Sequence, residues 1–299
     1  MSLAPRAVLV HRRTELDELI ARHGTRGQAA FFLSTRARSI EDAERRHTAD
    51  AAAIHAVSSA IPLDWRRGVV ERADLPRFLF APDDVVVVVG QDGLVANIAK
   101  YLDGQPVIGI NPDPGFNPGV LVAHPADAAD ALLRLAVSSR VDRHVEARVM
   151  VEAVLDDDQR LRALNEIFIG DASHQTSRYT ITGPDQTAER QASSGVIVST
   201  GTGATGWCRS AALERRSDLD LPAPTDHRLA WFVREAWPSP VTGTTVTEGA
   251  LVQAQTLTIT VESDHLVAFG DGMEADALTL GWGQTVHVSI ADQRLRLVR

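Results

Sequence analysis

Asp92 lies in a glycine turn that follows five consecutive valines, Val85 to Val89. The β-branched run predicts a strand buried on both faces of a parallel sheet, and residues 95–102 beyond the turn are compatible with a helix. A strand, a glycine turn and a helix N-terminus together direct backbone N–H groups at an anion, usually a phosphate. A carboxylate in that turn supplies a base or a metal-binding oxygen. The segment therefore predicts phosphoryl transfer, although such turns also occur as structural features alone.

Two further polar segments carry residues that could do chemistry. Asn165 and Glu166 directly precede the apolar residues 167–169. Residues 199–207, Ser-Thr-Gly-Thr-Gly-Ala-Thr-Gly-Trp, offer three glycines and four hydroxyl groups after an apolar run. Hydroxyl donors and close backbone approach suit a polar ligand. The alternative interpretations are a turn that caps backbone groups for the first segment and a flexible loop for the second.

The first part of the chain alternates strand-like and helix-like segments. Strands are predicted at 7–10, 29–33, 85–89 and 107–110, and helices at 15–22 and 40–60. Ser39 is expected to cap the longer helix, and Pro62 to end it. This alternation predicts an α/β domain over residues 1–125, a parallel sheet with flanking helices, which carries the Gly90-Gln91-Asp92-Gly93 turn.

The pattern changes after an alanine-rich helix predicted at 126–137. From residue 147 onward, short strand-like segments alternate with turn residues. They are expected at 149–155, 167–169, 179–181, 196–198, 257–261, 266–269, 286–290 and 295–298. The pattern predicts a β-rich, mostly antiparallel domain over residues 126–299.

Composition limits the partners. The net charge of −9 predicts no binding to nucleic acid or to an anionic membrane surface. The single cysteine, Cys208, excludes an intrachain disulfide, suits a reducing cytosol and is expected to pack in the core. No leader peptide and no run of about 20 apolar residues is recognisable, so a cytoplasmic protein is expected. The histidines show no metal-ligand spacing, and Asp156-Asp157-Asp158 is expected to be a solvated hairpin turn.

Together, and in this order, the three segments resemble the NAD kinase family. That family carries Gly-Gly-Asp-Gly-Thr after a buried strand, Asn-Glu at the start of a strand, and a loop similar to Ser-Thr-Pro-Thr-Gly-Ser-Thr-Ala-Tyr. The mitochondrial-type branch is more similar still, because its third loop has Gly for Pro and Trp for Tyr, as Gly201 and Trp207 do here. Asp271-Gly272 falls where the family has a late Asp-Gly, although Asp271 is equally well interpreted as a turn residue. The resemblance covers the chain from about Arg46 to its end.

The resemblance implies an NAD kinase with an NAD kinase-like fold. Such an enzyme transfers a phosphoryl group from ATP with Mg²⁺, or from polyphosphate, to the 2′-hydroxyl of the adenosine ribose of NAD and gives NADP. It implies that Asp92 accepts the hydroxyl proton and that Gly90, Gln91 and Gly93 line the phosphate path. No metal ligand of the protein itself is expected.

The resemblance also implies the residues that bind NAD. They are Asn165, Glu166, Thr202, Thr205, Trp207 and Ser210. Asn165 and Glu166 are expected to bind the ribose hydroxyls, and Trp207 to stack or to use its indole N–H. Small-molecule nucleotides are the expected partners, and the family forms dimers or higher oligomers, so a homodimer is expected.

Two residues of the first motif differ from the family. The chain reads Gly-Gln-Asp-Gly-Leu, so Gln91 replaces a glycine and Leu94 replaces a threonine. A glutamine would strain the turn if that position needs φ > 0, and Leu94 removes a hydroxyl that could touch phosphate. Two other functions therefore stay open: a degenerate homologue that binds NAD(H) or NADP(H) without turnover, and a kinase for another nucleoside-like metabolite.

Overall fold

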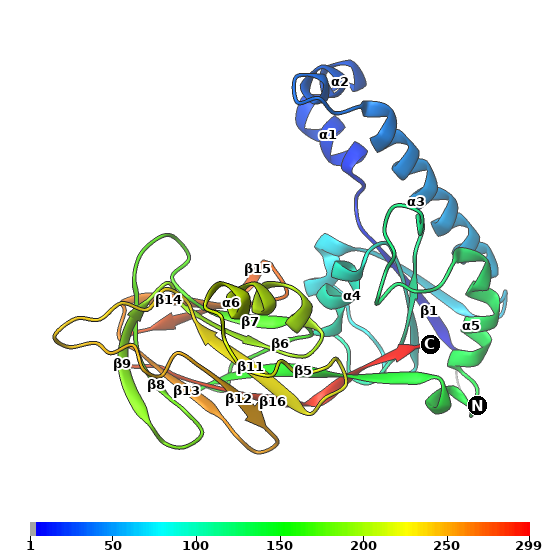
Figure 1. Ribbon diagram of the computed structural model, residues 1–299. Coiled ribbons are helices and arrows are strands. Elements are labelled where there is room, and N and C mark those ends of the chain that lie inside the picture. Colours follow the sequence, from blue (N-terminus) through cyan, green and yellow to red (C-terminus); the bar gives the residue numbers. More distant parts are fainter. Residues whose placement is uncertain (1–3) are drawn as a thin grey trace. The chain divides into compact units, whose positions relative to one another are not determined.

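The computed structural model describes residues 4–299, and these form two compact units (Figure 1). The first unit contains the described residues up to Glu146 together with Arg296–Arg299, and the second contains Ala147–Leu295. The elements of the first unit are β1 Arg6–His11, α1 Glu15–His23, α2 Arg26–Ser34, α3 Ile40–Ala60, β2 Arg66–Glu71, η1 Arg72–Arg77, β3 Asp84–Val89, α4 Asp92–Ala99, β4 Pro106–Ile110, η2 Ala126–Ala128, α5 Ala129–Ala136 and η3 Val141–Arg143.

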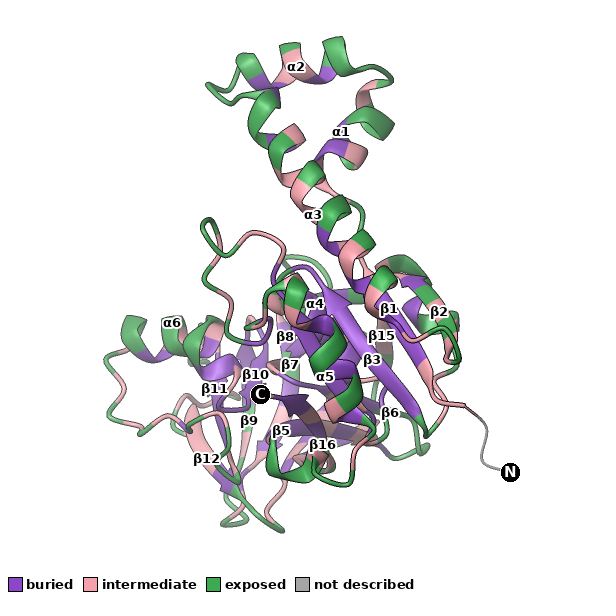
Figure 2. Ribbon diagram, turned by 90° about the vertical axis from the view of Figure 1, so that its right-hand side faces the viewer, coloured by how far each residue is buried: buried purple, intermediate pink, exposed green. Residues whose placement is uncertain are grey.

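The sheet of the first unit is parallel, in the order β2-β1-β3-β4, and the end of strand β16 (Thr285–Val298) extends it. Every residue of β3 is buried, which confirms the predicted two-sided burial of the valine run (Figure 2). Helices α3 and α5 pack on the sheet through apolar residues such as Val57 and Leu133. Because the strands are parallel, the carboxyl ends of β1, β3 and β4 lie at one edge, where α/β proteins usually bind ligands.

One predicted strand is wrong. Residues 29–33 belong to helix α2, whose N-cap Thr25 accepts a hydrogen bond from the backbone N–H of Gln28. Ala29 and Leu33 are four residues apart and pack together with Leu16 of α1 and the start of α3. A run of five apolar residues fits either a strand or a helix. Here the helical spacing places Ala29 and Leu33 against the apolar residues of α1 and α3.

Strand β2 (Arg66–Glu71) was not predicted. It is an edge strand with charged residues at three of six positions, so it lacks an apolar pattern. Helix α5 packs on the parallel sheet and therefore belongs to the first unit, whereas the predicted domain boundary at residues 125/126 precedes this helix. The chain returns to the first unit at its end because Arg296 and Leu297 pair with Pro106 and Val107 of β4.

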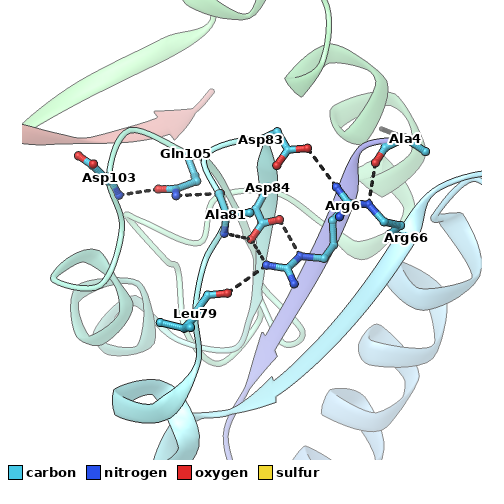
Figure 3. Close-up of polar contacts among 9 residues, drawn as sticks. All are labelled: Ala4, Arg6, Arg66, Leu79, Ala81, Asp83, Asp84, Asp103 and Gln105. Atoms are coloured by element: carbon cyan, nitrogen blue, oxygen red, sulfur yellow. Dashed lines mark hydrogen bonds and ion pairs between the residues drawn. The ribbon is translucent and has the colours of Figure 1, made fainter. Parts of the chain in front are cut away.

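A buried ion pair joins the amino ends of β1 and β3 (Figure 3). Asp84 is fully buried, and its carboxylate accepts hydrogen bonds from Arg6 Nε at 2.7 Å and Arg6 Nη2 at 2.6 Å. The backbone N–H of Ala81 donates a third bond at 2.7 Å. The neighbouring pair of Arg66 and Asp83, at 3.0 Å, is much more exposed. The buried pair therefore fixes the register at which β3 begins.

The second unit is built from antiparallel strands, as predicted. One sheet has the order β12-β11-β10-β7-β14-β15, and the other joins β16, β13, β8 and β9, with β5 and β6 paired beside them. The elements are β5 Val145–Leu155, β6 Arg160–Ala163, β7 Glu166–Gly170, β8 Ser177–Thr182, β9 Ala188–Ser193, β10 Val196–Ser199, η4 Gly203–Thr205, α6 Trp207–Glu214, β11 Arg228–Val233, β12 Glu248–Val252, β13 Leu257–Val261, β14 His265–Gly270, β15 Met273–Gly281 and β16. The apolar faces of these strands form one core.

None of the helices formed by residues 4–299 has the length and hydrophobicity of a membrane span. The same residues form no group of three or more His, Cys, Asp or Glu side chains that could hold a metal ion.

Candidate functional site

Asp92 is the first residue of α4, and its carboxylate is held by three successive backbone amides. Oδ1 accepts hydrogen bonds from the N–H groups of Val120 at 3.0 Å, Leu121 at 2.7 Å and Val122 at 3.0 Å. Oδ2 shares only the Val120 donor, at 2.9 Å. A carboxylate has about four acceptor positions. Oδ2 is therefore the oxygen with remaining capacity to accept a proton.

The segment that holds Asp92 is itself fixed. Gly119 has φ +65°, a conformation that favours glycine, and starts the turn into Val120. A Cβ on Gly109 would lie 2.0 Å from the carbonyl oxygen of Leu121, so the segment can lie against β4 only because residue 109 is glycine. Arg299 Nη1 donates to the carbonyl oxygen of Val120 at 2.7 Å. These contacts give the Asp92 carboxylate one orientation within the first unit.

The glycine turn tolerates Gln91 without backbone strain. Gly90 adopts φ +152°, whereas Gln91 is extended, with φ −112° and ψ 163°. The unusual conformation therefore falls on Gly90, and the expected strain at Gln91 is not found. Gly93 is exposed, with open space where a Cβ would lie. Leu94 is buried, and its Cδ2 would lie 3.4 Å from a Cβ on Gly90, so its side chain packs against the turn and offers no polar group there.

A cavity of about 300 Å³ lies in the first unit, where β1, β3 and β4 end. Gly90 and Gln91 line it, together with Arg12, Arg13 and Arg46. Sequence reasoning missed the three arginines as site residues, because the His11-Arg12-Arg13 segment has no motif of its own. The available signal was its position directly after a predicted strand of a parallel sheet.

The charges in this cavity are mixed. Arg46 Nη2 pairs with Glu15 Oε2 at 2.5 Å, and its guanidinium lies 5.1 Å from the centre of the Phe116 ring. Arg46 Nε is buried and makes no hydrogen bond to any other described residue. Burial raises the pKa of the Asp50 carboxyl above its ordinary value. The cavity thus combines guanidinium donors suited to phosphate with a partly desolvated carboxylate.

In the second unit, the structure brings the second and third polar segments together. Glu166 is paired with Ser199 across strands β7 and β10. The backbone N–H of Thr200 donates to the carbonyl oxygen of Asn165 at 2.9 Å, and its hydroxyl donates to that of Leu164 at 2.5 Å. The side chains of Asn165 and Glu166 form no hydrogen bond to another described residue, so both remain available to a ligand.

The loop 199–207 is packed tightly on its neighbours. A Cβ on Gly203 would lie 2.3 Å from the carbonyl oxygen of Asn165, and one on Gly201 would lie 1.8 Å from that of Ala223. Both glycines are buried. Close backbone contact, as distinct from flexibility, therefore accounts for glycine at these two positions.

The four remaining predicted binding residues lie on this loop and on α6. Thr202 Oγ1 accepts a hydrogen bond from buried Arg148 at 3.4 Å, whereas Thr205 and Ser210 are exposed. The Trp207 ring stacks on Phe168 at 5.6 Å, and the Arg234 guanidinium lies 5.0 Å from its centre. Trp207 is therefore held in a fixed orientation by Phe168 and Arg234. Asp92, Gly90, Gln91 and Gly93 belong to the first unit and these residues to the second.

Two titratable groups beside the loop are strongly affected by burial. Burial, and then the nearby charge of Asp271, raise the pKa of the Glu166 carboxyl to about 7. Burial raises the pKa of the Cys208 thiol to about 11. Cys208 is fully buried against Ala230 and Phe232, which confirms its expected packing role. Glu166 thus changes charge near neutral pH, whereas Cys208 stays protonated.

Comparison with known proteins adds to this geometry. The chain is similar in sequence to NAD kinases. The NAD kinase of Chlorobaculum tepidum is 31% identical over 144 residues, which cover 47% of this chain and 47% of that protein. The NAD kinase of Caldicellulosiruptor saccharolyticus is 25% identical over 72% of this chain and 76% of its own. NAD kinase 2, mitochondrial, of Rattus norvegicus is 32% identical over 42% of this chain and 39% of its own.

The matched part therefore spans about half or less of the first and third of these relatives. No protein-family model matches the chain. The similarity to a mitochondrial-type relative agrees with the resemblance drawn from Gly201 and Trp207.

Proposed function

We propose that this protein is an NAD kinase, which transfers a phosphoryl group to the 2′-hydroxyl of the adenosine ribose of NAD. The observation that carries the proposal is the Asp92 carboxylate. It is fixed at the N-terminus of α4 by three backbone amides through Oδ1, while Oδ2 keeps acceptor capacity. The sequence similarity to NAD kinases supports the choice of substrate.

The proposed chemistry begins at the ribose hydroxyl of NAD. A ribose hydroxyl is a poor nucleophile until its proton is accepted as the new bond forms, and Asp92 Oδ2 accepts it. The Asn165 amide and the Glu166 carboxylate, which make no hydrogen bond to described residues, bind the ribose hydroxyls of NAD. The fixed indole of Trp207 and the hydroxyls of Thr202, Thr205 and Ser210 hold the dinucleotide.

The donor phosphates are assigned to the cavity at the carboxyl edge of the parallel sheet. Gly90 and Gln91 line it beside Arg12, Arg13 and Arg46. A guanidinium group can donate two parallel hydrogen bonds to two oxygens of one phosphate. The donor is MgATP or polyphosphate, and a Mg²⁺ ion that enters with ATP is part of that substrate.

A second candidate function has support from the same carboxylate. Asp92 anchors residues 120–122, so the residue has a structural use that does not require turnover. Leu94 is buried and offers no hydroxyl to a phosphate. A homologue that binds NAD(H) or NADP(H) without phosphorylating it would keep all these features.

An Asp92→Asn variant separates the two. Asparagine keeps one oxygen for the amides of residues 120–122 but cannot accept the hydroxyl proton. We expect NADP formation to fall by roughly 10²- to 10⁴-fold, the usual contribution of a general base, while the Kd for NAD changes little. Asp127→Asn, at an exposed position of η2, is the matched control.

NADP formation is measured with MgATP and separately with polyphosphate, and NAD binding by calorimetry. NAD binding without NADP from either donor would reject the kinase and support the second candidate. Phosphorylation of a different nucleoside in place of NAD would reject NAD as the substrate.

A further inference from the structure

Asp271 makes contacts that a turn residue does not need. It lies with Gly272 between β14 and β15, at φ +55° and +65°, as in a two-residue hairpin turn. In such a turn the aspartate side chain normally faces solvent. Here Asp271 is 8% exposed, and its carboxylate points to a bend more than 100 residues earlier in the chain.

Three hydrogen bonds join Asp271 to three successive residues. Oδ2 accepts from the backbone N–H of Leu164 at 2.8 Å, and Oδ1 accepts from that of Asn165 at 2.6 Å. The backbone N–H of Asp271 donates to the carbonyl oxygen of Glu166 at 3.1 Å. Residues 164 and 165 lie between β6 and β7, where no strand ladder bonds their amides. The carboxylate satisfies donors that would otherwise be buried without a partner.

The same bend is held from its other side by the loop 199–207. Thr200 donates to the carbonyl oxygens of Leu164 and Asn165. Both carbonyls and both N–H groups of these two residues are thus bonded. The backbone direction at Asn165 and Glu166, and hence the starting direction of their side chains, is set by Asp271 and Thr200.

We propose that Asp271 is a positioning residue that directs the Asn165 amide and the Glu166 carboxylate at the ribose hydroxyls of the dinucleotide. Asp271 does not touch the dinucleotide and acts only through residues 164–166. The inference rests on the proposed function for the identity of the ligand. Burial of a carboxylate is costly unless it is hydrogen-bonded, and the bonds from the amides of Leu164 and Asn165 offset that cost at Asp271.

Asp271 also acts on Glu166 through its charge. Among the described residues, the Asp271 carboxylate is the charge that raises the pKa of Glu166, after burial itself. The Cys208 thiol of α6 is another titratable group that the Glu166 charge affects, and it stays uncharged at neutral pH because burial raises its pKa to about 11. Buried Arg148 lies on the Thr202 side of the loop. Removal of the Asp271 charge should therefore lower the pKa of Glu166.

The test is Asp271→Asn, which keeps the shape but replaces one acceptor oxygen with an N–H₂ group that faces a donor. We expect the Kd for NAD to rise roughly 10- to 100-fold, since small displacements of binding groups have effects of this size. The pKa of Glu166, followed by ¹³C NMR in the absence of NAD and assigned with Glu166→Gln, should fall toward its ordinary value. Asp158→Asn is the matched control, because Asp158 is also a hairpin residue with positive φ but is exposed.

A folded Asp271→Asn protein with an unchanged Kd and an unchanged Glu166 pKa would overturn the proposal. Hydrogen exchange of the wild-type protein decides the matter if the variant does not fold. The amides of Leu164 and Asn165 should then be strongly protected, and exchange at the rate of exposed loop amides would overturn the proposal. Failure of the wild-type protein to bind NAD would reject the proposed function, while the pKa and exchange measurements would still decide the role of Asp271.

Discussion

The buried ion pair of Arg6 and Asp84 makes a quantitative prediction about the first unit. Asp84→Ala removes the acceptor of three short hydrogen bonds, two from Arg6 and one from the backbone N–H of Ala81. The Arg6 side chain is 23% exposed, so its guanidinium stays partly desolvated after the substitution and keeps, among the described residues, only the hydrogen bond from Nη2 to the carbonyl oxygen of Leu79 at 3.1 Å. Removal of one partner of a buried ion pair typically costs about 3–5 kcal/mol of unfolding free energy.

The neighbouring pair provides the control, because Arg66, the first residue of β2, pairs with Asp83, the residue directly before β3, at the same end of the sheet (Figure 3). Their side chains are 40% and 54% exposed, and an exposed pair contributes about 1 kcal/mol or less. We therefore expect Asp83→Ala to lower the unfolding free energy by no more than about 1 kcal/mol. Replacement of both buried partners, Arg6→Met with Asp84→Leu, should recover much of the loss, since no charge remains desolvated.

Urea unfolding measures these differences. Trp65 is the tryptophan of the first unit, and the other four, Trp207, Trp231, Trp237 and Trp282, lie in the second. A chain in which those four are replaced by phenylalanine would therefore report the unfolding of the first unit by fluorescence. Equal losses from Asp84→Ala and Asp83→Ala would refute the reasoning, because Asp84 is buried and accepts three hydrogen bonds whereas Asp83 is exposed and accepts one from Arg66.

Two further predictions concern the second unit. Burial and Asp271 raise the pKa of Glu166 from 4.5 to about 7, so between these pH values the folded state keeps a proton that the unfolded state loses. The unfolding free energy should therefore fall by about 3 kcal/mol as the pH rises from 4.5 through 7. Urea unfolding of wild type and Glu166→Gln at pH 5 and pH 8 checks this, and an equal fall in both proteins would contradict it. Gly203→Ala should cost about 1–3 kcal/mol and weaken NAD binding, since its Cβ would lie 2.3 Å from a backbone oxygen of Asn165. Gly27→Ala, where the Cβ meets open space in α2, should be neutral or stabilising, and a similar loss in both variants would exclude the close contact as the cause.

Local pattern was enough to predict the strand, turn and helix around Asp92. Five β-branched residues, a glycine and a helix-compatible segment each favour the element that forms, and burial of the valines on both faces follows from the α/β alternation. The same reasoning failed for residues 29–33 and for β2. The short apolar run at 29–33 fits both the helical and the strand periodicity. The edge strand β2 carries charged residues that hide the alternation of a strand.

Contacts between distant residues could not be predicted from local pattern. The family resemblance assigned Asn165 and the loop 199–207 to the same ligand, but the hydrogen bond between Asn165 and Thr200 was not predicted. The role of Asp271 was hidden because Asp-Gly alone predicts a hairpin turn. The arginines of the cavity lie on the loop after β1 and on α3, and only the fold brings them to one edge. The strain expected at Gln91 did not arise, because the positive φ falls on Gly90.

The return of residues 296–299 to the first unit affects how the chain folds as it is made. The ribosome releases residues 1–146 about 150 residues before the segment that pairs with β4, a delay of roughly 8–30 s at ordinary rates of synthesis. During that time Pro106 and Val107 of β4 lack their partner strand, and Val120 lacks its contact with Arg299. The first unit is thus completed only after residues 147–295 have been translated, and a nascent chain stalled before residue 296 should hold the Asp92 segment less firmly than the full chain.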